Sequence, residues 1–175
     1  DLSIFLNKDI DEIVKLLQSN KITSEDLIRV SNEKYIITEP NIHAWAFYNS
    51  NKKKINMKNF SAGYSNGFLR DIPFGIKDIF NTADMPTEMG SPIWKNFKPG
   101  NNARVVDKLI WSGAVPVGKT VTAEFAVHYQ NSTLNPHNAN RTPGTSSSGS
   151  AAAVAAGVVP FALGTQTAGS IIRPS

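Results

Sequence analysis

The chain has 175 residues, of which 41% are hydrophobic and 18% charged, and its net charge is +4. This composition excludes extended disorder and fibrous classes, and the charge is too small to indicate a nucleic-acid partner by itself. The absence of cysteine excludes disulfides, thiolate metal sites and cysteine nucleophiles. Because no apolar run suits a membrane helix and no signal-peptide core is visible, we expect a cytoplasmic protein.

The first 60 residues have the pattern of a helical segment appended to a larger domain. Between residues 10 and 17, apolar residues recur with the spacing of one helix face. Residues 23–26 resemble a capping box that begins a second helix, and we expect Glu39-Pro40 to end it, since proline disfavours a helical residue before it. Residues 49–67 indicate a loop or weak helix, with a solvated basic run at residues 52–54.

From about Asp71 the pattern changes to short strands that alternate with helices. We expect strands at 72–76, 114–117 and 158–163, and helices at 103–112 and 148–156. This alternation predicts an α/β fold with a mixed, largely parallel central sheet flanked by helices. We therefore divide the chain into a helical segment (1–60) and the start of a main domain (61–175). The chain begins at Asp1 and ends abruptly at Ser175, so we expect a portion of a longer polypeptide.

Residues 113–120 match the phosphate-binding pattern G-x-x-x-x-G-K-[ST] in every position. A phosphate-binding loop follows a strand and begins a helix, whereas here the first glycine follows a predicted helix and the middle of the segment is apolar. Pro116 also removes one of the N–H donors that such a loop needs. We expect a helix end, a buried strand and a polar turn instead, and a nucleotide hydrolase is the less favoured alternative.

Two segments rich in Ser, Thr and Gly, residues 142–150 and 164–174, flank the predicted Ala-rich helix and the apolar strand after it. Small residues allow backbone N–H groups to approach a reacting oxygen closely, which is how an oxyanion hole is built. Their position between rigid elements distinguishes these segments from a flexible linker. The pattern indicates a serine nucleophile.

A serine nucleophile needs a base. His43, His128 and His137 lie in no recognisable nucleophile setting, and the chain contains no G-x-S-x-G motif. The other base that chemistry allows is a lysine held neutral by burial. Lys77, at the end of the first strand of the main domain, is the candidate, and a solvated edge-strand lysine is the alternative interpretation of this residue.

Three motifs in this order resemble the amidase signature family. They are Gly-Ile-Lys-Asp at 75–78, Gly-Thr-Ser-Ser-Ser-Gly-Ser-Ala-Ala-Ala at 144–153, and Gly-Thr-Gln-Thr-Ala-Gly-Ser-Ile-Ile-Arg-Pro at 164–174. Residues 117–120, 124–126 and 135–136 also resemble the family. The resemblance runs from about residue 71 to the last residue, and it implies the amidase signature fold, here present only in its N-terminal portion.

The resemblance implies an amide hydrolase with a Ser–Ser–Lys triad. Ser170 would attack the amide carbonyl, and Ser146 would relay its proton to Lys77. An acyl-enzyme would form and then be hydrolysed by water. The backbone N–H groups of residues 167–170, which include Thr167, Ala168 and Gly169, would bind the oxyanion.

In the family, the relay serine follows a cis peptide bond, so the resemblance implies a cis bond between Thr145 and Ser146. The sequence departs from the family pattern nearby. Thr145 stands where the family usually has Gly, and Gln166 and Ala168 stand where many members have Asp and Gly.

The resemblance implies a small-molecule amide substrate and a mechanism that requires no metal or organic cofactor, and it leaves the oligomeric state open. The weak charge and the lack of a long apolar run lead us to expect no nucleic-acid or membrane partner. A catalytically inactive fragment or an interaction module of the same fold is the alternative function, because the family's catalytic domain continues beyond the nucleophile. Formation of glutaminyl- or asparaginyl-tRNA by a member of the same family also stays open, although the weak positive charge does not favour it.

Overall fold

The structure is a computed structural model that describes residues 8–50 and 67–175. The predicted boundary at residue 60 and the basic run at residues 52–54 lie outside the described residues, as does most of the predicted loop at 49–67. The division of the chain at residue 60 therefore stays a prediction. No helix in the described ranges is long and apolar enough to cross a membrane.

A four-stranded sheet with the order β1-β3-β2-β4 forms the centre of the fold. Its strands are β1 (Trp45–Tyr48), β2 (Pro73–Lys77), β3 (Val115–Thr120) and β4 (Phe161–Leu163). The central strand β2 pairs in parallel with β3 and β4, and β1 pairs antiparallel with β3. This arrangement confirms the mixed, largely parallel sheet. The strand β1 was not expected from the sequence, and β4 is shorter than the predicted strand.

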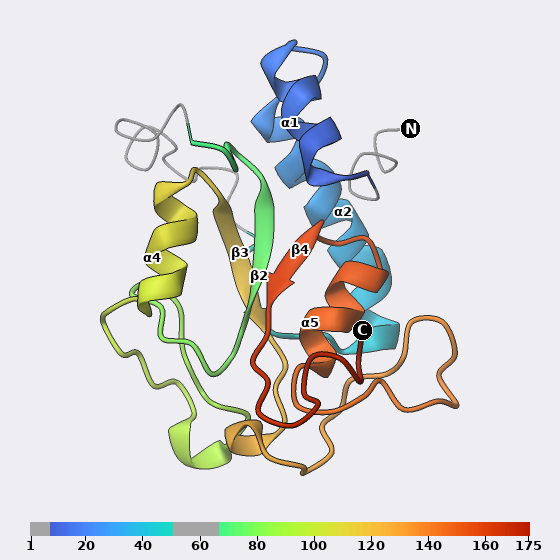
Figure 1. Cartoon of the computed structure of the whole chain (residues 1–175). Coiled ribbons are helices and arrows are strands. Elements are labelled where there is room, and N and C mark those ends of the chain that lie inside the picture. The colour runs from blue at the N-terminus through green and yellow to red at the C-terminus, as the bar shows by residue number, and fades with distance from the viewer. Residues whose placement is uncertain (1–7, 51–66) are drawn as a thin grey trace.

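Helices cover both faces of this sheet (Figure 1). The α-helices are α1 (Ile10–Gln18), α2 (Ser24–Ile42), α4 (Arg104–Trp111) and α5 (Ser148–Ala155), and short 3-10 turns occupy Pro92–Trp94 and Glu124–Ala126. On one face, Val106 of α4 packs on Phe74 and Ile76 of β2. On the other, α2 and α5 share a core with Val115 and Val117 of β3.

Helix α2 begins as predicted and ends later than predicted. The Thr23 hydroxyl accepts the N–H of Asp26 at 3.1 Å, and the Asp26 carboxylate accepts the N–H of Thr23 at 3.0 Å, which confirms the capping box. The expected stop before Pro40 is wrong, because the helix continues to Ile42. The residue before a proline disfavours the helical conformation, but packing of the buried Ile42 in the core outweighs this preference. Beyond the helix end, the Glu39 carboxylate accepts the N–H groups of residues 44 and 45.

The segment that matches the phosphate-binding pattern has the structure expected of a helix end and a buried strand. Gly113 follows α4 with a φ of +92°, and β3 then runs through six buried residues to Thr120. This is a helix–turn–strand arrangement, and no α-helix begins directly after the Gly-Lys-Thr residues to receive a phosphate. Lys119 is committed to a buried ion pair with Asp78.

Helix α5 lies unusually close to the sheet because its first turn contains Gly149. A Cβ atom at this position would lie 2.4 Å from the backbone nitrogen of Val121 and 2.6 Å from the carbonyl oxygen of Ala44. Only glycine fits such a close approach of two backbones. The serines that precede and begin α5 are thereby held against the carboxyl ends of β2 and β3.

Candidate active site

Lys77 is the last residue of β2, and its side chain is completely buried. Its amine lies within hydrogen-bond distance of three hydroxyls, at 2.8 Å from Ser146 Oγ, 3.0 Å from Ser147 Oγ and 2.7 Å from Thr165 Oγ1. The strand delivers the amine to the loops at the carboxyl edge of the sheet, where parallel sheets place their ligand sites. The alternative interpretation of Lys77 as a solvated edge-strand lysine is wrong.

Burial lowers the pKa of the Lys77 amine to about 8. Desolvation disfavours the charged form of a lysine, and neutral hydroxyl partners do not restore it as a carboxylate would. No carboxylate lies within ion-pair distance of Lys77 in the described ranges. The neighbouring carboxylate, that of Asp78, is paired with Lys119 instead. Adjacent residues along a strand project to opposite faces of the sheet, which directs the Asp78 carboxylate away from Lys77.

A network of hydroxyls fixes the segment that carries the serines. Ser147 Oγ donates to the carbonyl oxygen of Thr165 at 3.1 Å and accepts the N–H of the same residue at 3.2 Å. One turn into α5, Ser150 Oγ donates to the carbonyl oxygen of Leu163 at 2.8 Å and shares a 2.7 Å hydrogen bond with Thr120 Oγ1. These bonds join the start of α5 to β3 and to the end of β4.

The expected cis peptide bond before Ser146 is not present. Every peptide bond among the described residues is trans, and this includes the bond between Thr145 and Ser146. The trans form avoids the roughly 3–4 kcal/mol that a cis bond costs at a residue other than proline. The Ser146 hydroxyl reaches the Lys77 amine from the trans backbone.

The segment that carries Ser170 packs beside the segment that carries Ser146. The N–H of Ser147 donates to the carbonyl oxygen of Ser170 at 3.1 Å, and Thr145 Oγ1 donates to the carbonyl oxygen of Gly169 at 3.3 Å. Within the described part of the chain, the Ser170 hydroxyl makes no hydrogen bond to Ser146 or Lys77. Of the three predicted catalytic residues, the structure thus brings Lys77 and Ser146 together and holds Ser170 nearby through its backbone.

The predicted oxyanion hole lies in an irregular loop after β4. The backbone N–H groups of residues 167–170 donate to no other described residue, so they are available to a ligand. The next two N–H groups, of Ile171 and Ile172, are instead occupied by the Gln166 side-chain oxygen, at 3.1 Å and 2.9 Å. The side chain of Gln166 therefore shapes this loop from within, a contact that the sequence did not indicate.

Two open clefts are lined in part by residues 142–150. One, of about 520 Å³, has His137, Ser147 and Ile171 among its lining residues. The other, of about 270 Å³, is lined in part by His128 and Thr145. Lys77 and Ser146 line neither of these two clefts and are completely buried.

Sequence reasoning missed two partners of the lysine, Ser147 and Thr165. Both belong to the Ser/Thr-rich segments that the sequence singled out, but the pattern did not show which of the clustered hydroxyls face the amine. Ser147 is distinguished from its neighbours by its position at the N-cap of α5. Thr165 is distinguished by following β4, which is hydrogen-bonded to β2.

Comparison with known proteins identifies the family. The family model Amidase matches residues 26–175. A relative from Lactobacillus johnsonii, named as a subunit of glutamyl-tRNA(Gln) amidotransferase, is 39% identical over 177 aligned residues, which cover 98% of this chain and 36% of that protein. This chain therefore spans about a third of the length of the curated relative.

Solved structures agree with the sequence comparison. The corresponding amidotransferase protein of Thermotoga maritima is 34% identical with a TM-score of 0.81, over 97% of this chain and 36% of that one. The native peptide amidase of Stenotrophomonas maltophilia is 28% identical with a TM-score of 0.83, over 94% of this chain and 37% of that one. Together with the buried lysine and its serine partners, these similarities show that the chain belongs to the amidase family, of which it contains the N-terminal portion.

Proposed function

We propose that the protein hydrolyses an amide bond through a Ser–Ser–Lys triad. Ser170 Oγ attacks the carbonyl carbon while its proton passes to Ser146, whose own proton passes to the neutral Lys77 amine. As the C–N bond breaks, the proton returns through Ser146 to the leaving nitrogen. Water then attacks the acyl-enzyme ester and regenerates Ser170.

The observation that carries this proposal is the environment of Lys77. A buried amine with three hydroxyl partners and a pKa near 8 can accept a proton close to neutral pH. A lysine with a purely structural role would gain more from a carboxylate partner, and none contacts it among the described residues. The environment therefore suits a base.

The proposal requires the Ser170 hydroxyl to meet Ser146 when substrate is bound. Hydrogen bonds in a catalytic site are often long or poorly aligned in the free enzyme and tighten in the substrate complex. The backbone contact between Ser147 and Ser170 supports this approach, since it holds the nucleophile loop against the relay segment. The free N–H groups at residues 167–170 suit the oxyanion that would develop there.

The direct test is hydrolysis of a panel of primary amides, including glutamine and peptide amides, by the full chain. We expect turnover that Ser170→Ala abolishes and that Ser148→Ala leaves within about twofold. Ser148 is a matched control, because its hydroxyl accepts from Asn131 and does not contact Lys77. Activity that survives Ser170→Ala would exclude Ser170 as the nucleophile.

A catalytically inactive module is the alternative, and a fluorophosphonate probe distinguishes it. The probe reacts with an activated serine whatever amide the enzyme prefers, so it needs no knowledge of the substrate. Labelling of Ser170 supports the hydrolase, whereas a folded protein that never labels supports the inactive module. The predictions that no cofactor is needed and that the protein is cytoplasmic belong to this proposal.

A second candidate function is that of one component of a tRNA-dependent amidotransferase. Sequence identity favours it, since relatives named as part of glutamyl-tRNA(Gln) amidotransferase reach 40% identity, against 28% for the peptide amidase structure. The small-molecule amide would then be the source of the amide group. Amide hydrolysis that appears only when partner proteins co-purify would favour this candidate, and turnover by the isolated chain would favour a free-standing amidase.

A further inference from the structure

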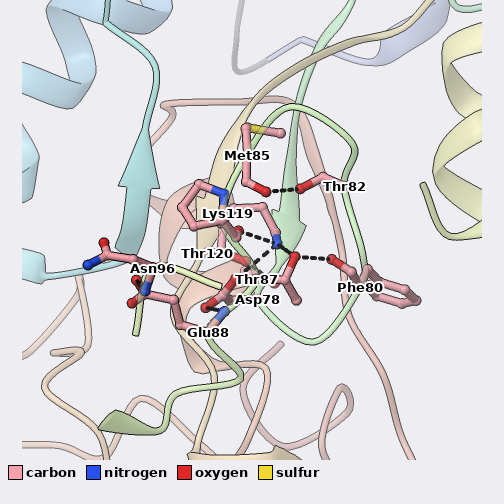
Figure 2. Close-up of polar contacts among 11 residues, drawn as sticks. Asp78, Phe80, Thr82, Met85, Thr87, Glu88, Asn96, Lys119 and Thr120 are labelled. Carbon is pink, nitrogen blue, oxygen red and sulfur yellow. Dashed lines mark hydrogen bonds and ion pairs between the residues drawn. The ribbon is translucent and has the colours of Figure 1, made fainter. Parts of the chain in front are cut away.

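A second lysine, Lys119 of β3, is buried on the opposite face of the sheet from Lys77. Its side chain is completely inaccessible, and its ammonium lies 2.9 Å from Asp78 Oδ1. It also donates to the carbonyl oxygen of Pro86 at 2.9 Å and to Thr87 Oγ1 at 2.7 Å. Figure 2 shows Asp78 and Thr87 directed at the Lys119 ammonium. The catalytic steps proposed above make no use of Lys119.

The Asp78 side of this pair is equally fixed. Asp78 Oδ2 accepts the N–H of Glu88 at 3.1 Å, and the carbonyl oxygen of Asp78 accepts the N–H of Met89 at 3.0 Å. Thr87 Oγ1 donates in turn to the carbonyl oxygen of Phe80 at 3.2 Å. The loop after β2 is thus wrapped around the Lys119 ammonium, and the orientation of the Asp78 carboxylate is determined by several bonds.

The register of the sheet places the two lysines on opposite faces. Lys77 pairs with Thr120, and Ile76 pairs with Lys119, so that Lys119 and Thr120 project to different sides of β3. A register shift between Phe74 and Gly75 adds one residue to β3 and sets this alternation. Asp78 directly follows Lys77 in the chain. Its backbone N–H donates to the carbonyl oxygen of Thr120 at 2.9 Å.

This arrangement solves an electrostatic difficulty of the proposed site. The Asp78 carboxylate is adjacent in sequence to Lys77. Without a cation to pair with, or if it could turn toward Lys77, this carboxylate would stabilise the charged form of the Lys77 amine. We propose that Lys119 is a positioning residue that neutralises the Asp78 carboxylate and holds it on the far face of the sheet, so that Lys77 stays available as the base. This inference rests on the proposed function.

The charged groups around both lysines are few in the described part of the chain. Lys77 faces only the hydroxyls of residues 146, 147 and 165 within hydrogen-bond distance. Lys119 faces Asp78 directly, with Asp84 and Glu88 acting on it at longer range. Burial raises the pKa of the Asp78 carboxyl and lowers that of the Lys119 amine, and each partner opposes the shift of the other.

The test measures the pKa of Lys77 itself, by NMR titration of the full chain with ¹³Cε-labelled lysine. The Lys77 signal is assigned by its loss in Lys77→Arg. In Lys119→Met the unbalanced carboxylate should raise the Lys77 pKa by roughly one unit, the effect of a unit charge about 10 Å away at an effective dielectric constant of about 20. The double variant Asp78→Asn/Lys119→Met should return it to the wild-type value.

The same variants are assayed for the pH dependence of fluorophosphonate labelling. We expect the pH at the midpoint of the labelling profile to increase in Lys119→Met and to return to the wild-type value in the double variant. A folded Lys119→Met variant with an unchanged Lys77 pKa and an unchanged labelling midpoint would overturn the inference. Loss of a lysine with only a structural role would lower stability without changing either value.

A second variant keeps the test decisive where Lys119→Met does not fold. Asp78→Asn leaves the Lys119 ammonium unbalanced and should lower the Lys77 pKa, and an unchanged Lys77 pKa in the folded variant would overturn the inference. Failure of the proposed function has a different signature. In that case the wild-type protein does not label at any pH, while the NMR titration still reports whether Lys119 and Asp78 control the charge of Lys77.

Discussion

If Lys77 is the base, the rate at which a fluorophosphonate labels Ser170 should follow the deprotonation of one buried amine. The perturbation is pH, applied to the wild-type chain and to Lys77→Met. Below the pKa of Lys77 the amine is protonated and cannot accept the proton that Ser146 relays. Above it the amine is neutral, and the labelling rate should no longer depend on pH.

The structure sets the size of the effect. An amine with the usual pKa of 10.5 is neutral in only about 0.03% of molecules at pH 7, whereas one with a pKa of about 8 is neutral in about 9%. Burial of Lys77 therefore raises the population of the active form about 300-fold at pH 7. The labelling rate should rise about tenfold per pH unit well below pH 8 and level off above it.

The assay records the second-order labelling rate from pH 6 to pH 9.5 in buffers of constant ionic strength. Lys77→Met should lower the plateau by about 10²–10⁴-fold, the usual contribution of a general base, and remove the slope. A small serine-reactive reference compound run in the same buffers corrects for the pH dependence of the probe. A flat profile for the wild type, or a slope that Lys77→Met retains, would refute the assignment of Lys77 as the base.

Three further measurements test the surroundings of the site. The folded-state pKa of Lys77 lies below its unfolded value of 10.5, so the folded chain binds fewer protons than the unfolded chain between about pH 8 and 10.5. In urea unfolding, the stability of the wild type relative to Lys77→Met should therefore rise by about 3 kcal/mol across that window and stay constant below it. Gly149→Ala should cost roughly 1–3 kcal/mol in the same assay, since the new methyl group meets the backbone of Val121, and an unchanged midpoint would contradict the close approach. Ser147→Ala, which removes one partner of the Lys77 amine, should slow Ser170 labelling about tenfold, and an equal effect of Ser148→Ala would show that the loss is not specific to the lysine.

The sequence predicted those parts of the fold that local chemistry determines. The capping box at Thr23 fixed the start of α2, and the apolar alternation around Phe74 identified β2. It did not predict β1, since four residues carry too little local signal and their pairing with β3 depends on a contact between distant segments. The end of α2 was misplaced for a related reason, because the packing of Ile42 is a tertiary effect.

The candidate site divides in the same way. Residue chemistry alone pointed to Lys77 and to the two hydroxyl-rich segments, and family resemblance selected Ser146 and Ser170 within them. Which hydroxyls surround the amine depends on how α5 and the loop after β4 meet β2. That geometry brings Ser147 and Thr165 to Lys77, and no spacing in the sequence encodes it.

Alternation along β2 places Lys77 and Asp78 on opposite faces of the sheet. It could not supply the actual partner, Lys119, because this residue comes from a different strand and reaches its face through a register shift. In the sequence, the same lysine belonged both to a phosphate-binding pattern and to the family-like segment at residues 117–120, and neither assigned it a role. Its burial shows why a motif requires its structural context before it indicates a function.

The position of the acyl group in the reaction intermediate identifies the nucleophile. The full chain is mixed with an intact amide that it hydrolyses, and the reaction is quenched in acid within the first turnover. The protein is then digested and analysed by mass spectrometry. We predict an acyl group on Ser170 that is absent in Ser170→Ala and greatly reduced in Lys77→Met. An acyl group on any other residue, or turnover by Ser170→Ala at the wild-type rate, would contradict the account.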